Sequence, residues 1–152
     1  MKNKKIKNYT YTGLGFPVEL KNITMLFIEG EWCPKIDVRL ISDIVIKSLP
    51  FQKERLTGNQ IKFIRSYFEM SLREFSNSVV SVSHTAVSKW ENCTESATNM
   101  DTSIEIILRL YVYEQTSINT KKEKLEFFEK YLALREMKFL SSTPKVILMD
   151  VA

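Results

Sequence analysis

Polar side chains that can form hydrogen bonds recur on one side of the stretch SHTAVSKWEN, residues 83–92. With the helical repeat of about 3.6 residues per turn, this side carries His84, Thr85, Ser88, Lys89 and Asn92. Hydroxyl groups and a longer donor can reach base edges in a DNA groove, where carboxylates would be repelled by phosphates. The face has no acidic residue, and Glu91 lies at its margin. Its chemistry suits binding to a nucleic acid duplex.

The helix that carries this face is predicted to begin after Ser83, a residue type that caps helix N-termini. Its other side carries Ala86, Val87 and Trp90, which are suited to packing against a core. An ordinary surface helix with a solvated polar face meets the same description, so the pattern alone leaves both interpretations open.

A shorter helix is predicted just before it. Ser71 and Glu74 have the S-x-x-E spacing of a capping box, and Leu72 and Phe75 would face inward. Two capped helices around a tight turn indicate a helix-turn-helix. Both N-termini would also present free N–H groups and the positive end of a helix dipole, which favour phosphate contacts.

The stretch from Leu56 to about Tyr113 resembles the XRE, or Cro/repressor, type of helix-turn-helix. LTGNQIKFIRSYFEMSLREF is similar to its first two helices, and VSHTAVSKWEN is similar to its recognition helix. The resemblance implies base-reading by His84, Thr85, Ser88 and Lys89, and phosphate contacts by Ser71, Arg73, Ser83 and Asn92. It also implies a homodimer that binds a palindromic operator in double-stranded DNA.

The turn between the two helices departs from this family. Most members have a Gly-Val turn of minimal length, whereas Asn77 to Val82 is one residue longer and has Ser81 in place of glycine. The departure leaves open how the first of the two helices ends and at what angle they meet.

The N-terminal third is predicted to hold a small β-β-α lobe. Residues 1–8, MKNKKIKN, are interpreted as a basic flexible tail. The more specific alternative is a mobile arm that contacts phosphates. Over residues 9–51, the runs Phe16–Leu20 and Ile23–Phe27 alternate apolar and polar residues, which indicates a hairpin that turns at Lys21-Asn22. The GLG at residues 13–15 is interpreted as a turn.

A helix is expected to follow this hairpin. Asp37 can cap it, and Pro50 marks its end. The residues at helical spacing that are expected on its apolar face are Val38, Ile41, Ile44, Val45 and Leu49.

The helix-turn-helix domain is predicted over residues 52–116, and its first residues, Gln52–Arg55, are the polar boundary stretch. Thr57 and Gln60 form a T-x-x-Q capping box, and Asp101 can cap a later helix. The residues expected on the apolar stripe of that later helix are Ile104, Ile107, Leu108 and Tyr111.

Residues 117–152 are predicted to form a C-terminal helix and strand, with a possible role in dimerisation. The helix would run from Lys121 to about Leu140, and the strand is KVILMDV. Because an isolated strand has an unpaired edge, it must pair with the N-terminal hairpin or with a second copy. The fold class is therefore α+β and mainly helical: a central helix-turn-helix bundle, an N-terminal β-hairpin/helix lobe, and this C-terminal element.

The N-terminal lobe, GFPVELKNITMLFIEGEW with the Asp37 helix, more weakly resembles the front half of MqsA-type antitoxins. The layout is that of MqsA- and HigA-type antitoxins without the zinc site, since only Cys33 stands in the region where the zinc cysteines are expected. This resemblance implies a cognate toxin as a partner and repression of the protein's own operon. A stand-alone regulator without a toxin remains an alternative.

The composition argues against several other functions. The chain of 152 residues has a net charge of +4, 2 cysteines and 1 histidine, so no zinc site, other metal or cofactor is expected. His84 has no orienting acid or nucleophile suggested nearby, which argues against an enzyme. No apolar run is long enough for a membrane span, and a cytoplasmic protein is expected. A protein-interaction module that keeps the helix-turn-helix fold without reading DNA remains open.

Overall fold

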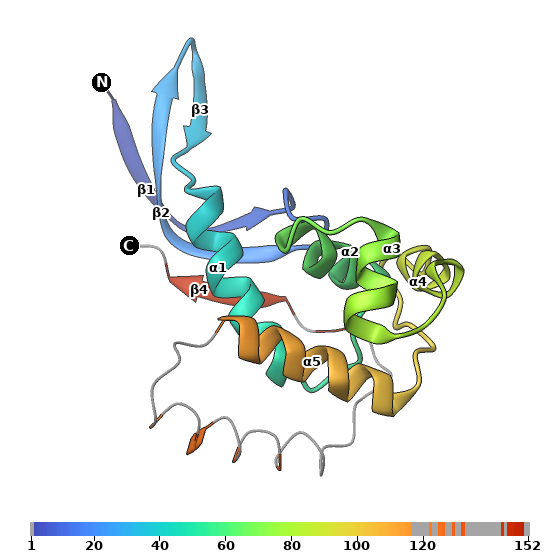
Figure 1. Cartoon of the computed structure of the whole chain (residues 1–152). Helices are drawn as coiled ribbons and strands as arrows, with labels where there is room; N and C mark the ends of the chain where they lie inside the picture. Colours follow the sequence, from blue (N-terminus) through green and yellow to red (C-terminus); the bar gives the residue numbers. More distant parts are fainter. Residues whose placement is uncertain are drawn as a thin grey trace. The chain divides into compact units, whose positions relative to one another are not determined.

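The computed structural model describes residues 2–116, isolated positions between 122 and 132, Pro144 and residues 146–150. The fold is α+β, with one sheet and a set of helices (Figure 1). Two compact units make up the chain: Met1–Ser42 with Lys145–Ala152, and Asp43–Pro144. The division falls inside helix α1, Val38–Ser48, and not at Gln52–Arg55, where a boundary was predicted.

The sheet of the first unit is built around one long strand. Its strands are β1 (Asn3–Tyr11), β2 (Val18–Ile28), β3 (Glu31–Pro34) and β4 (Ile147–Asp150). β1 pairs antiparallel with β2 along most of its length. On the other edge of β2, β4 pairs in parallel with the first half and β3 pairs antiparallel with the second half. The final strand therefore pairs with the N-terminal hairpin, one of the two partners expected for it.

The segment predicted to be a flexible basic tail is a strand, so that prediction is wrong. Asn3 lies opposite Leu26 and Lys5 lies opposite Thr24 in the β1–β2 ladder. A lysine-rich composition indicates disorder because it offers little apolar surface to bury. Here the neighbouring strand β2 supplies the backbone pairing that the composition does not reveal.

The turn predicted at Lys21-Asn22 is instead a kink within the single strand β2. Buried residues alternate on both sides of it but are out of phase by one position: Val18 and Leu20, then Ile23 and Met25. Asn22 has a φ of 56°, a left-handed conformation that asparagine tolerates better than most residues. The pairing register with β1 is the same on both sides of the kink. The first hairpin turns at residues 12–17, which include the GLG predicted to be a turn.

Short helices make up the second unit, together with the last part of α1. They are η1 (Leu49–Phe51), α2 (Gly58–Tyr67), α3 (Leu72–Phe75), η2 (Ser76–Val80), α4 (His84–Glu91) and α5 (Thr102–Thr116). Their core contains Ile61, Ile64, Phe75, Val87 and Leu108, all buried. Among the helices that the structure describes, none combines the length and the apolar composition that crossing a bilayer requires.

Five predicted N-terminal caps are confirmed. The full capping box is present at Thr57 and Gln60. The carboxylate of Asp37 accepts the N–H of Leu40 at 3.1 Å, and the carboxylate of Asp101 accepts the N–H of Ser103 at 2.9 Å. The Asp101 carboxylate also accepts the Ser103 hydroxyl, and these hydrogen bonds lower the pKa of Asp101. The fourth and fifth caps, at Ser71 and Ser83, begin α3 and α4.

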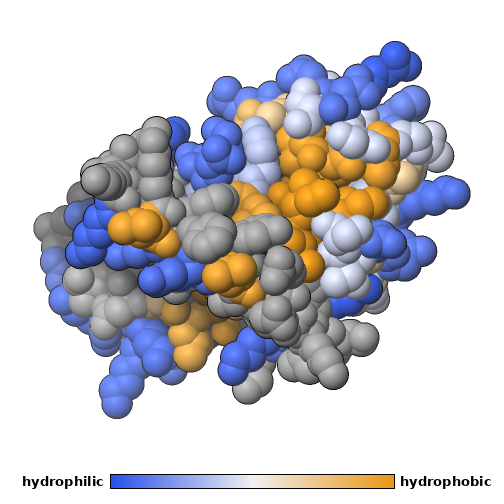
Figure 2. Space-filling model, turned by 60° about the horizontal axis from the view of Figure 1, so that its bottom comes forward, coloured by the Kyte–Doolittle hydropathy of each residue, from blue (hydrophilic) through white to orange (hydrophobic). Residues whose placement is uncertain are grey.

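Two predicted apolar faces are partly wrong. Val38 and Ile44 of α1 are 50% and 38% exposed, although Ile41, Val45 and Leu49 are buried as expected. In α5, Leu108 is buried but Ile107 is 52% exposed. Figure 2 brings forward the lower side of the Figure 1 view, where α5 lies, and shows apolar side chains on that surface.

The C-terminal helix expected from Lys121 to about Leu140 lies mostly outside the described residues. The isolated positions that the structure does describe there, such as Leu125 and Leu132, are helical and exposed.

The extra residue in the helix-turn-helix turn is accommodated by a π-helical turn. The carbonyl of Ser76 accepts the N–H groups of Ser81 and of Val82, and such wider turns hold one residue more than an α-helical turn. Ser81 closes the helix with φ 53° and ψ 41°, the left-handed conformation that usually favours glycine. Ser81 therefore adopts a conformation that glycine commonly provides at the end of a helix.

Replacing Ser81 by glycine is expected to stabilise the protein. A left-handed conformation costs a residue with a Cβ about 1–2 kcal/mol, part of which is offset by the greater entropy that glycine loses on folding. We expect Ser81→Gly to raise the free energy of unfolding by about 0.5–1 kcal/mol in urea titrations. The control is Ser78→Gly, at an exposed position inside η2, which should lower it by about 0.5 kcal/mol. If both substitutions changed the free energy of unfolding in the same direction, this account of the turn would be contradicted.

Candidate nucleic-acid interface

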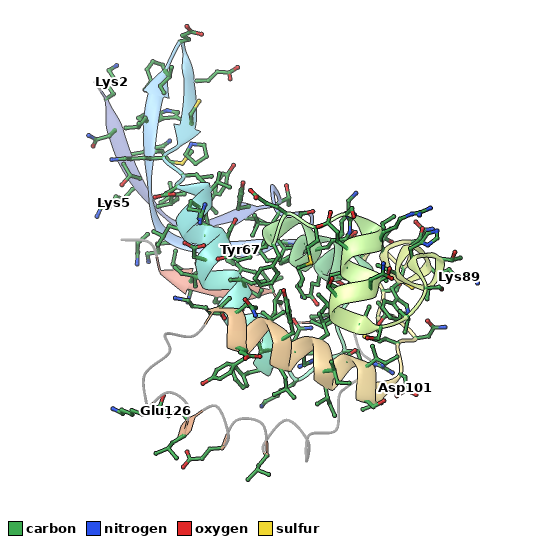
Figure 3. The ribbon with its side chains drawn as sticks, in the orientation of Figure 1. Lys2, Lys5, Tyr67, Lys89, Asp101 and Glu126 are labelled. Atoms are coloured by element: carbon green, nitrogen blue, oxygen red, sulfur yellow. The ribbon has the colours of Figure 1, made fainter. Side chains whose placement is uncertain are left out.

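The polar face of α4 is turned toward solvent. His84, Thr85, Lys89 and Asn92 are exposed, and Ser88 is half-buried. Figure 3 shows the Lys89 side chain pointing away from the helix. Val87 and Trp90 on the opposite side are buried, with exposed fractions of 0% and 6%. The structure thus brings the sequence-predicted base-reading residues together on one accessible side of a single helix.

The N-terminus of α4 is capped and open. The Ser83 hydroxyl accepts the N–H of Ala86 at 3.2 Å, and Ser83 itself is exposed. This fixes the first turn while the remaining N–H groups of that turn stay available to a phosphate oxygen. The predicted phosphate-contacting position at Ser83 is therefore compatible with the geometry.

The N-terminus of α3 is less suited to an anion. The Ser71 hydroxyl accepts the N–H of Glu74 at 3.1 Å and lies 3.2 Å from the Glu74 carboxylate, to which it can donate. A phosphate at Ser71 would meet this carboxylate, so the charge of Glu74 opposes the predicted contact. Arg73, the other position predicted on this helix, is exposed and adds a positive charge beside it.

Glu91, the acidic residue at the margin of the polar face, forms a bidentate ion pair with Arg65. The Arg65 guanidinium donates to the two carboxylate oxygens of Glu91 at 2.7 and 2.9 Å, and to the Met70 carbonyl at 3.0 Å. The hydrogen bond to Glu91 raises the pKa of Arg65 above its ordinary value. Both side chains are largely buried, with exposed fractions of 18% and 10%. This pair links α2 to α4 and neutralises the acidic residue at the margin of the polar face.

A glycine allows the N-terminus of α2 to pack closely against the end of α4. A Cβ at Gly58 would clash with backbone atoms of Trp90, Glu91 and Thr94. The N–H of Asn59 donates to the Thr94 carbonyl at 2.9 Å. The C-terminal end of α4 is thereby held by the backbone as well as by the Arg65–Glu91 pair.

A buried ion pair on α5 anchors the segment that leads into α2. The Arg109 guanidinium donates to Glu105 at 2.9 Å and to the backbone carbonyls of Pro50, Gln52 and Glu54. Both charged side chains have an exposed fraction of 0%. Burial lowers the pKa of Arg109, and the neighbouring Glu105 carboxylate opposes that effect.

This cluster was not predicted from the sequence, because the inward side of the helix was expected to be apolar and Gln52–Arg55 was interpreted as a boundary. The one local signal was the spacing of Glu105 and Arg109, four residues apart, which usually marks an exposed helix pair. Arg55 extends the cluster, because it donates to the Met100 carbonyl and lies 3.4 Å from Glu105.

The arrangement as a whole can bind a polyanion and position donors against it. The polar face of α4 holds hydroxyl, imidazole and ammonium groups. The carboxylate at its margin, that of Glu91, is paired with Arg65. Within the part of the chain that the structure describes, no three His, Cys, Asp or Glu side chains gather in a way that could hold a metal ion. Comparison with protein families, with curated proteins and with solved structures finds no match for this chain.

Proposed function

We propose that the protein is a sequence-specific DNA-binding repressor in which α4 is the recognition helix. The observation that carries the proposal is the exposed face of His84, Thr85 and Lys89, backed by buried Val87 and Trp90. The capped N-terminus of α4 and the paired state of Glu91 support it further. A helix fixed on its inner side and polar on its outer side suits insertion into a major groove.

A homodimer on a palindromic operator is part of this proposal. One short recognition helix contacts only a few base pairs, and two copies related by a two-fold axis double the number of contacts. Light scattering on the full chain would report a dimer. A monomer at high concentration would contradict this part.

We further propose that the regulator is the autoregulating antitoxin of a toxin–antitoxin pair. The support is the antitoxin-like layout, in which a small β-rich unit accompanies the helix-turn-helix. A co-transcribed neighbouring reading frame of a different fold, whose product binds this chain, is expected. An isolated gene would favour a stand-alone regulator instead.

Replacing Lys89 by alanine tests the recognition face. We expect the affinity for a duplex from the gene's own upstream region to fall by about 1–3 kcal/mol in quantitative gel shifts, since a lysine that reads a base contributes about that much. The matched control is Lys62→Ala, an exposed lysine on α2. Equal effects of the two substitutions would remove Lys89 from the base-reading set. No retardation of any upstream fragment, even at low salt, would favour the protein-interaction module.

A further inference from the structure

We propose that the outer edge of β1 is a docking site for an extended acidic segment of another protein, which adds to the sheet as a further strand. β1 pairs with β2 on one side only, and no strand among the described residues pairs with its other side. An open strand edge is a template for backbone hydrogen bonds. The site belongs to the first unit, so the proposal goes beyond DNA binding by α4.

The ladder shows which backbone groups of β1 face outward. The Lys2 carbonyl accepts the N–H of Phe27 at 3.1 Å, so the backbone of Lys2 faces β2. In an antiparallel ladder, successive residues alternate in this direction. Lys4 therefore also faces β2, while the N–H and C=O groups of Asn3 and Lys5 point to the outer edge and offer the hydrogen bonds for an added strand.

The charges along this edge select an acidic partner. Lys2, Lys4, Lys5 and Lys7 are all exposed. Figure 3 shows the side chains of Lys2, which immediately precedes β1, and of Lys5 within β1 projecting outward. In a self-pairing of β1 across a two-fold axis, lysines would lie opposite or diagonal to lysines, and like charges across strands are destabilising. A strand with carboxylates would gain from the same positions, so a second copy of this chain is a poor occupant.

The distribution of these lysines favours a strand over a nucleic acid. Side chains alternate between the faces of a strand, so Lys2 and Lys4 lie on one face and Lys5 on the other. On the first face, the ammonium groups of Lys2 and Lys4 lie 5.7 Å from the Phe27 ring and 4.1 Å from the Trp32 ring. A phosphate backbone needs a row of cations on one side. An added strand projects its own side chains to both faces of the sheet. It can therefore contact Lys2 and Lys4 on one face and Lys5 on the other.

The test is a peptide titration of the full chain. The probe is a fluorescein-labelled peptide as long as the 9 residues of β1, built from Glu, Thr and Val with Glu on both faces. We expect saturable binding by anisotropy, at least about tenfold weaker for Lys4→Glu/Lys5→Glu and unchanged for Lys47→Glu/Lys62→Glu. Equal binding of the same peptide with Gln in place of Glu, or no binding of the acidic peptide, would overturn the proposal.

Amide hydrogen exchange distinguishes strand addition from a loose charge contact. Peptide addition should slow exchange at Asn3 and Lys5, whereas the Lys4 amide, which already faces β2, should change little. Binding without this alternating protection overturns the strand geometry. Displacement of the peptide by a short single-stranded DNA that binds more tightly would identify the edge as a nucleic-acid surface. Duplex retardation through α4 is a separate readout, so failure here leaves the proposed DNA binding intact.

Discussion

Replacing Arg109 by alanine is expected to lower the free energy of unfolding by about 3–5 kcal/mol. The substitution leaves the Glu105 carboxylate buried without its main partner and removes the donor to the carbonyls of Pro50, Gln52 and Glu54. A buried charge that loses its partner cannot regain water without local unfolding. Urea denaturation followed by the fluorescence of Trp90, which is buried in the same unit, measures the loss.

The control for this prediction is Arg73→Ala, an exposed arginine whose loss should change stability by no more than about 0.5 kcal/mol. Arg109→Lys keeps the charge but not the planar fork, and should fall between alanine and the unaltered chain. This variant keeps the prediction measurable if Arg109→Ala does not fold. Equal stabilities of Arg109→Ala and Arg73→Ala would show that the buried cluster does not form.

The second large effect is expected from Arg65→Ala. This change removes both hydrogen bonds to Glu91 and the one to the Met70 carbonyl. We expect a loss of about 2–3 kcal/mol in stability, less than for Arg109 because the Arg65–Glu91 pair is partly exposed to solvent. The freed Glu91 carboxylate would also lie beside Lys89 and Asn92, so duplex affinity should fall as well.

A second substitution separates the two effects of Arg65→Ala. In Arg65→Ala/Glu91→Gln, the free carboxylate is gone, so duplex affinity should recover although much of the stability loss remains. The two single changes should also couple by about 1 kcal/mol or more in a double-mutant cycle, because the side chains are in direct contact. Duplex affinity that stays low in the double variant would show that the charge of Glu91 is not what weakens binding.

The helix starts could be predicted because their physics is local. At Asp37, Thr57, Ser83 and Asp101 the side chain accepts an N–H only two or three residues further on, so the residue type and its immediate neighbours are sufficient. The polar face of α4 was predictable for the same reason, since it follows from the helical repeat over ten residues. The XRE resemblance and the function it implies remain predictions.

What could not be predicted depends on partners distant in the sequence. Arg109 is satisfied by carbonyls 55 to 59 residues earlier, and no local pattern indicates that contact. The first part of β1, Asn3 to Asn8, looks disordered by composition until β2 is placed beside it. Around Asn22 the sequence shows that the alternation of apolar and polar residues shifts by one position. A turn between two strands and a kink within one strand produce the same shift. The sequence also showed the extra residue before Ser81, but only the hydrogen bonds show that a π-helical turn absorbs it.

The central claim is that α4 lies in the major groove of duplex DNA, and guanine N7 protection tests it most directly. Dimethyl sulfate methylates guanine N7, which is exposed only in the major groove. With the gene's own upstream duplex, we predict protected guanines in two clusters about 34 Å apart, one helical turn, as two recognition helices would produce. Lys89→Ala should weaken the protection and Lys62→Ala should not. A duplex that is bound while every guanine N7 remains reactive would contradict the account.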